Sequence, residues 1–103
     1  MNKKVNAVLQ WVKKEDGGRE LPPTGPCFFI VGRVPEYESF EKWKKEAWTF
    51  KIEFITQPDE TLTHNVKISY LMDEAPCYLH LNCLFELYEG YKLVAKGKVI
   101  GES

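Results

Sequence analysis

Cys77, His80 and Cys83 are the residues whose types and spacing most resemble a metal-binding set. Zinc is usually held by thiolate and imidazole groups that lie within a few ångströms of one another. The run around these residues is rich in strand-forming types, and in a strand His80 faces away from both cysteines. Cys77 and Cys83 would then lie about 20 Å apart, at about 3.3 Å per residue. The sequence therefore predicts neither a metal site nor a cofactor.

A nucleophile with a neighbouring base is the next chemistry that the residue types allow. Cys27 together with His64 or His80 would supply the two groups, although no recognised catalytic motif surrounds them. A phosphate-binding loop of the form G-x-x-x-x-G-K-[ST] is absent, since Gly97-Lys98 lacks the upstream glycine and the following Ser or Thr. The sequence predicts a non-enzymatic protein that binds no nucleotide by itself. A small enzyme that uses Cys27 or a histidine stays open as an alternative.

Basic residues at two places are candidates for phosphate contacts. Arg19 follows two glycines, whose backbone freedom suits a sharp turn that presents the guanidinium. Lys92, Lys96 and Lys98 are spaced by even numbers, so in a strand they share one side and form a basic ridge. A solvated loop arginine and the wet face of a barrel account for the same residues. Both interpretations stay open at the level of sequence.

Length and composition favour one domain that spans residues 1–103, with 44% hydrophobic residues for a core. Fourteen Lys and Arg against fifteen Asp and Glu provide no bulk attraction to nucleic acid or to an anionic membrane. No apolar run approaches the roughly 20 residues of a membrane-spanning helix, and the first residues are not followed by the apolar core of a signal peptide. Three cysteines, an odd number, indicate reduced thiols. We expect a cytoplasmic protein without a membrane partner.

Alternation of apolar and polar residues predicts an all-β fold. Single strands are expected over 5–12, 27–32, 48–56 and 64–72, and two more strands form a hairpin within 78–100. Turn signals separate the strands at intervals of about 8–12 residues. A six-stranded antiparallel closed β-barrel is favoured because closure leaves no exposed sheet edge.

Within these strands the pattern also predicts which side chains face the core. The strand at 27–32 is expected to be buried on both faces or nearly so. The later strands are expected to turn the following residues inward: Val66, Ile68, Tyr70 and Met72, and then Leu79, Leu81, Cys83, Phe85 and Leu87. Glu89 and Gly90 are expected to form the tight hairpin turn, at positions of positive φ.

The segment 34–46 has two interpretations. Phe40, Trp43 and Ala47 are spaced to share one face of a short helix, which Ser39 would cap. An exposed loop anchored by one or two aromatic side chains explains the same residues. The sequence leaves this choice open.

Two stretches, taken together, resemble one known family. Residues 13–19, Lys-Lys-Glu-Asp-Gly-Gly-Arg, are similar to the Lys-x-Glu-Glu-Gly-Gly-Arg stretch after the first strand of the third, C-terminal domain of bacterial elongation factor Tu. Residues 85–100, which contain Tyr-Glu-Gly-Tyr at 88–91, resemble the final hairpin of that domain. The resemblance covers about 5–31 and 66–101. It implies a free-standing elongation-factor-Tu-like barrel of six antiparallel strands.

In that family the domain packs on the GTPase domain, docks the nucleotide exchange factor and contacts the T stem of aminoacyl-tRNA. By position, the resemblance places Arg19 and the Glu89-Gly90 turn on the surface that contacts tRNA. Several family residues differ here. Glu20 replaces a histidine, the stretch 25–31 lacks both family arginines, and Tyr88 and Tyr91 replace an arginine and a glycine.

We therefore expect a translation-elongation-factor-like binding module with a protein partner. Loss of three family arginines weakens the phosphate contacts that supply most sequence-independent RNA affinity. Tyr88 and Tyr91, taken as exposed, suit a protein interface, in which aromatic residues are enriched. The alternative is tRNA binding through the following residues: Arg19, Glu89, Gly90, Lys92, Lys96 and Lys98.

Overall fold

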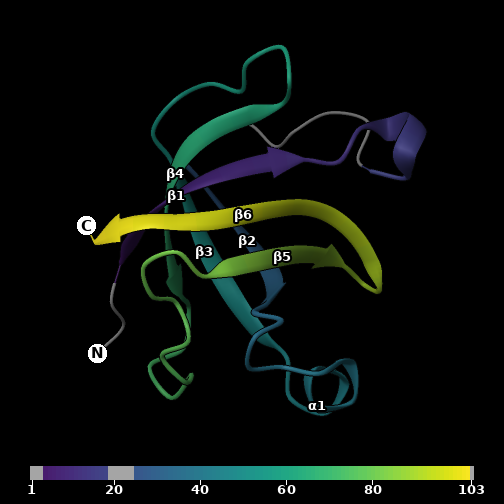
Figure 1. Ribbon diagram of the computed structural model, residues 1–103, viewed down its shortest axis with the longest axis vertical. Coiled ribbons are helices and arrows are strands. Elements are labelled where there is room, and N and C mark those ends of the chain that lie inside the picture. The colour runs from purple at the N-terminus through teal and green to yellow at the C-terminus, as the bar shows by residue number, and fades with distance from the viewer. Residues whose placement is uncertain (1–3, 19–24, 103) are drawn as a thin grey trace.

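A computed structural model describes residues 4–18 and 25–102 of the chain. Six strands close into one antiparallel barrel, as Figure 1 shows. The strands are β1 (Val5–Trp11), β2 (Cys27–Arg33), β3 (Trp48–Phe54), β4 (Thr63–Tyr70), β5 (Leu84–Glu89) and β6 (Lys92–Glu102). Their order around the barrel is β1-β4-β3-β2-β5-β6, and β6 closes it by pairing with β1 and β5. The predicted all-β barrel is confirmed.

The core fills the barrel from every strand. Alternate residues point inward, and the buried ones include Val5, Ala7, Leu9, Ile30, Phe50, Ile52, Val66, Ile68, Phe85, Leu87, Val94, Ala95 and Val99. Phe85 lies against Gly97 on the paired strand β6, where a Cβ atom would come within 2.2 Å of its ring. Glycine at position 97 therefore makes room for the phenylalanine ring.

Several predicted inward positions were wrong. Met72 and Leu81 are exposed, because β4 ends at Tyr70 and the chain then runs through irregular structure to β5. Phe29 is exposed as well, so β2 is not buried on both faces. Residues 78–83 form no strand: Asn82 has a φ of 69°, and the Cys83 amide donates a hydrogen bond to the carbonyl of His80 at 3.0 Å.

The segment after β2 folds into a short helix, which settles the choice left open by the sequence. The helix α1 (Phe40–Lys45) begins after Ser39, whose hydroxyl accepts a hydrogen bond from the Lys42 amide at 3.2 Å. Trp43 is its buried residue and donates its indole N–H to the carbonyl of Gly32 on β2 at 2.9 Å. A 3-10 turn, η1 (Lys14–Asp16), follows β1. No helix in the described part of the chain is long and apolar enough to cross a membrane.

The β5–β6 hairpin turns one residue later than predicted. Glu89 still pairs with Lys92, so Gly90 and Tyr91 form a two-residue loop. Gly90 has a φ of 64° and occupies the first loop position, which is the pattern of a type II′ turn. Positive φ is therefore confined to Gly90 in this turn, and Tyr91 stands at its tip.

Candidate functional site

The hairpin tip and α1 meet on the outside of the barrel, on the right-hand side of Figure 1. Tyr88 projects outward from β5, and α1 places Trp43 on it with ring centroids 4.7 Å apart. Phe40 packs edge-on against both rings, at 6.3 and 6.4 Å. Tyr91 completes the group, 6.1 Å from Trp43. We call these four residues, Phe40, Trp43, Tyr88 and Tyr91, the aromatic surface.

Beneath the aromatic surface, an ion pair fixes its base. Arg33 at the end of β2 donates to Glu86 on β5 at 2.7 Å, and its Nε donates to the carbonyl of Glu38 at 2.9 Å. The guanidinium also lies 3.9 Å from the centre of the Phe40 ring, a cation–π contact. Both charged groups are largely shielded from water. The pair therefore joins β2, β5 and α1.

Tyr88 belongs to the same network. Its hydroxyl donates to Glu86 at 2.7 Å. Burial raises the pKa of Tyr88 to about 12, and the hydrogen bond to the Glu86 carboxylate adds to the shift. The side chain is only 5% exposed. The prediction that Tyr88 is an exposed contact residue was wrong, because α1 covers it.

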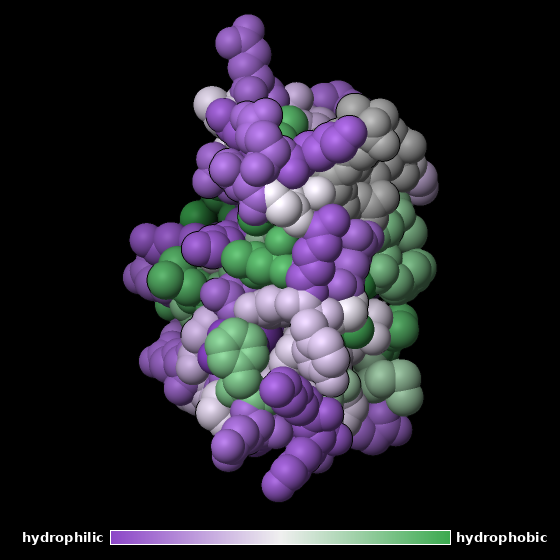
Figure 2. Space-filling model, turned by 90° about the vertical axis from the view of Figure 1, so that its right-hand side faces the viewer, coloured by the Kyte–Doolittle hydropathy of each residue, from purple (hydrophilic) through white to green (hydrophobic). Residues whose placement is uncertain are grey.

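The top of the aromatic surface is open. Tyr91 is 76% exposed and Phe40 is 50% exposed, whereas Trp43 between them is 3% exposed. A hollow of about 330 Å³ lies beside Tyr91, lined by Val31, Trp43, Lys44, Ala47 and Gly90. Lys44 places its ammonium 5.6 Å from the centre of the Tyr91 ring. Figure 2 views the side that carries the hairpin tip and α1, and shows green and pale surface between purple margins.

The predicted basic ridge does not form as one row. Lys96 and Lys98 are exposed, and in the strand register they lie opposite Glu86 and Leu84 on β5. The β5–β6 register shifts between Leu87 and Tyr88, so β6 contains a bulge on the way to Lys92. A bulge inserts one residue and reverses the alternation of faces across it. The prediction that the three lysines share one side was wrong for Lys92, which lies beside the hairpin turn.

Arg19 lies outside the described residues. Its predicted neighbours Glu89 and Gly90 are at the hairpin tip, where Glu89 ends β5. The structure thus brings Gly90, Tyr91 and Lys92 together beside α1, and places Lys96 and Lys98 farther along β6.

A second aromatic group lies beside α1 and was missed by the sequence interpretation. Tyr37 stacks on Tyr78 with ring centroids 4.8 Å apart and donates or accepts a hydrogen bond at 2.7 Å with His80 Nε2. Glu36 lies 3.4 Å from the same nitrogen. Lys42 of α1 donates to the Tyr78 hydroxyl at 2.9 Å. Two loops far apart in the chain form this group, so the spacing of residues within either loop does not predict it.

This second group is poorly arranged for nucleophilic catalysis. Tyr37 and Glu36 both approach Nε2 of His80, while Nδ1 lies 3.1 Å from the carbonyl of Leu81. A relay would need the carboxylate and the nucleophile on opposite ring nitrogens. Desolvation, followed by the Glu36 charge, raises the pKa of Tyr37, which disfavours the phenolate.

Cys83 and the other histidine, His64, are held within the fold. Burial raises the pKa of the Cys83 thiol and disfavours the reactive thiolate. His64 has both ring nitrogens engaged, by Trp11 and by the carbonyl of Thr56, so it is not aimed at Cys27. The argument against a metal site assumed a strand over 77–83, which was wrong. Over residues 4–18 and 25–102, no three His, Cys, Asp or Glu side chains gather to hold a metal ion.

No protein-family model matches this chain, and no curated protein matches it. The resemblance to the third domain of elongation factor Tu therefore stays a prediction.

Proposed function

We propose that this barrel is a non-enzymatic protein-binding module that docks its partner on the aromatic surface. The observation that carries the proposal is the contrast within that surface: Tyr91 and Phe40 are exposed, and the residues under them are fixed. Binding hot spots are rich in large aromatic side chains that are held in place before the partner arrives.

The rigid base explains why an exposed Tyr91 favours binding. Its backbone sits in a two-residue turn, and Trp43 beside it is locked by a hydrogen bond to Gly32. Little side-chain entropy is then lost on docking, because tyrosine has few rotatable bonds and its neighbours are already ordered. The adjoining hollow of about 330 Å³ is large enough to accept an apolar side chain from the partner.

The resemblance to the third domain of elongation factor Tu is in line with this proposal, because that domain docks other macromolecules. The proposal places the module in the cytoplasm, since Cys27, Cys77 and Cys83 are all free thiols.

RNA binding is the second candidate, and a specific observation favours it. The exposed Tyr91 ring is flanked by Lys44 and lies beside Lys92, a combination that also suits stacking of a single-stranded base next to phosphates. Glu41 in α1 and Glu46 at its C-terminal end put negative charge on the helix that carries Lys44, which disfavours phosphate approach and makes the protein partner the better proposal.

A quantitative affinity purification tests the proposal. The intact chain and the Phe40→Ser/Tyr91→Ser variant are used as baits in the native host, with Ile55→Ser as the matched control. Ile55 is apolar and about as exposed as Phe40, but it follows β3, away from the aromatic surface. We expect one or more proteins to be lost about tenfold or more with the double variant and retained with Ile55→Ser.

Treatment with ribonuclease separates the two candidates. Protein partners that survive it support the proposal, whereas partners that disappear with the RNA support the second candidate. Partners that bind the double variant as well as the intact chain would overturn both.

A further inference from the structure

The outer face of β1, β6 and β5 carries a second surface, distinct from the aromatic surface. The strand registers place its side chains in rows across the sheet. Val8 on β1 pairs with Lys98 on β6, which pairs with Leu84 on β5. The next row runs from Gln10 to Lys96 and Glu86. Because these residues alternate with the core positions, they all point away from the barrel.

Two large apolar side chains on this outer face are open to water. Leu84 is 62% exposed and Ile100 is 50% exposed, and both flank the two exposed lysines. Two adjoining hollows share Leu84, Lys96 and Gly97 as common walls. One, of about 480 Å³, extends toward the loop after β2, and the other, of about 350 Å³, extends toward Val8 and Ile100. Contiguous exposed apolar surface of this kind marks an interaction site.

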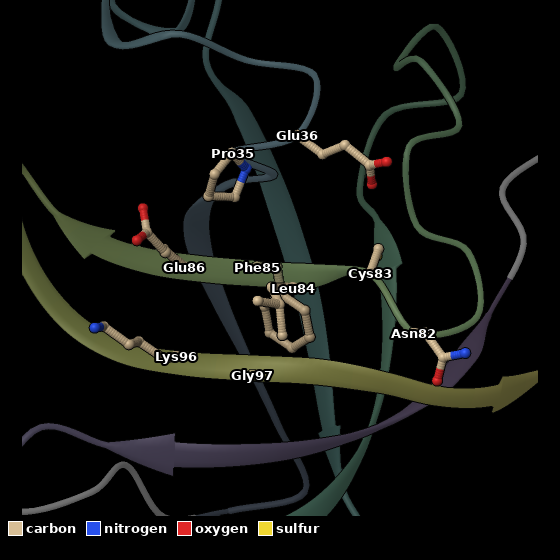
Figure 3. A pocket seen from close by; sticks show the side chains of 9 residues that line it. All are labelled: Pro35, Glu36, Asn82, Cys83, Leu84, Phe85, Glu86, Lys96 and Gly97. Atoms are coloured by element: carbon tan, nitrogen blue, oxygen red, sulfur yellow. The ribbon is translucent and has the colours of Figure 1, made fainter.

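Figure 3 shows the larger hollow from close by. Leu84 and Phe85 lie at its centre, between the loop that carries Pro35 and Glu36 and the strand that carries Lys96. β2 pairs with β5 as far as Arg33 opposite Glu86, and the loop then leaves the sheet beside Leu84. The hollow thus results from the departure of the chain after β2.

The charges on this outer face are one-sided. Lys96 and Lys98 are exposed, whereas the Glu86 carboxylate is already engaged by Arg33 and Tyr88. The other carboxylate of the larger hollow, Glu36, stands at its rim and lies 3.4 Å from His80. Positive charge therefore remains over β6, and negative charge lies at the edges of this face, at Glu36 on the loop after β2 and at Asp16, which lines a hollow together with Gln10 and Lys96.

From this pairing of apolar and basic groups we propose that the outer face binds an acidic segment of a partner protein with two apolar side chains. The apolar side chains occupy the two hollows beside Leu84, and the carboxylates lie over Lys96 and Lys98, away from Glu36. Single-stranded RNA fits this face less well, because Leu84 and Ile100 offer no stacking plane and no charge. The inference does not depend on the aromatic surface.

Titration followed by NMR tests the inference with a defined probe. The probe is a synthetic glutamate-rich peptide of about 15 residues that contains two leucines, and a glutamine-for-glutamate copy serves as the neutral probe. We expect saturable amide shifts at Val8, Leu84, Lys98 and Ile100 below about 1 mM peptide, and about tenfold weaker binding of the neutral probe.

Variants of the full chain locate the contact. Leu84→Ser and Lys96→Gln/Lys98→Gln are each expected to weaken binding about tenfold, whereas Lys42→Gln/Lys45→Gln on α1 leaves it unchanged. Circular dichroism confirms that each variant is folded. The inference is overturned if no saturable shifts occur below about 1 mM, if the α1 variant weakens binding equally, or if an oligouridylate of similar length binds this face more tightly.

Discussion

Trp11 and Trp43 are each 3% exposed, yet they belong to clusters that face opposite ways. Trp11 points into the barrel, where its indole N–H donates to His64 Nε2 at 2.8 Å and its ring meets Phe28. His64 therefore carries its proton on Nδ1, which lies 3.1 Å from the carbonyl of Thr56. Phe54 stacks on the imidazole at 5.1 Å. This inner cluster uses all of its polar atoms for the fold.

The cluster around Trp43 is built from the same residue types on the outside of the barrel. Its base is fixed as firmly as the inner cluster, by the Arg33–Glu86 ion pair and by the hydrogen bond from Trp43 to Gly32. Phe40 and Tyr91, however, stay open to water. Aromatic residues inside the barrel thus stabilise it, whereas those outside it are available to a partner.

The largest expected effect is on the inner cluster. Trp11→Ala removes a buried ring and leaves His64 without its donor, so we expect a loss of about 3–5 kcal/mol in the free energy of unfolding. Urea denaturation followed by circular dichroism measures it. A loss below about 1 kcal/mol would show that the inner cluster is not structural.

The base of the aromatic surface comes next. Arg33→Ala leaves Glu86 without its cation in a shielded position, and we expect a loss of about 3 kcal/mol in the free energy of unfolding. The double variant Arg33→Met/Glu86→Leu serves as the control and is expected to cost less than Arg33→Ala, since no unpaired charge remains. Equal losses in the two variants would mean that the ion pair does not fix the base.

His64 is expected to make the free energy of unfolding depend on pH. Burial lowers the pKa of His64, so below about 6.5 the unfolded chain takes up a proton that the folded barrel resists. The free energy of unfolding should therefore decrease as pH falls from 7 toward the folded pKa, by at most about 1.4 kcal/mol per pH unit for this group.

Denaturation at several pH values measures this slope. His64→Phe should remove the contribution, whereas His80→Gln should leave it in place, because His80 is exposed beside Tyr37 and Glu36. A slope that disappears with His80→Gln instead would reverse the assignment.

A smaller effect concerns the start of α1. Ser39→Ala removes the hydroxyl that accepts from the Lys42 amide, and we expect a loss of about 1 kcal/mol in the free energy of unfolding. Ser39→Asp keeps an acceptor and is expected to retain the stability of the intact protein. Thermal denaturation in parallel distinguishes them, and an equal loss in both variants would argue against the cap.

Some of this organisation could be predicted from the sequence. The runs over β1 and β3 alternate cleanly, because one face of each strand meets the core, and Ser39 before an amphipathic turn indicates a cap. After β4 the alternation of apolar and polar residues did not predict the structure correctly. The run 78–81 alternates in the same way, but it turns away at Asn82, a residue type that tolerates positive φ.

The candidate sites were harder to predict, since they depend on distant contacts. Alternation gives the side of the sheet to which Tyr88 points, but the helix that covers it comes from another part of the chain. The β-bulge inserts one residue into β6 between Lys92 and Lys96, so Lys92 does not share the side of Lys96 and Lys98. No sequence signal marks this bulge. Tyr37 and His80 are 43 residues apart and meet through two irregular loops.

The smallest expected effect on stability belongs to Tyr91. Tyr91→Ser should change the free energy of unfolding by less than about 0.5 kcal/mol, because the side chain is exposed. Urea denaturation of Tyr91→Ser and Trp11→Ala in parallel compares the two losses of unfolding free energy directly. A loss above about 2 kcal/mol would mean that Tyr91 acts in the fold rather than at a docking surface.

Photo-crosslinking in the native host tests whether a partner protein docks on the aromatic surface. A benzoylphenylalanine is placed at position 91 in one chain and at position 55 in another, so that two exposed sites on different parts of the barrel are compared. We expect a discrete protein adduct at position 91 that withstands ribonuclease, and none at position 55. Adducts at both positions alike, or none at position 91, would contradict it.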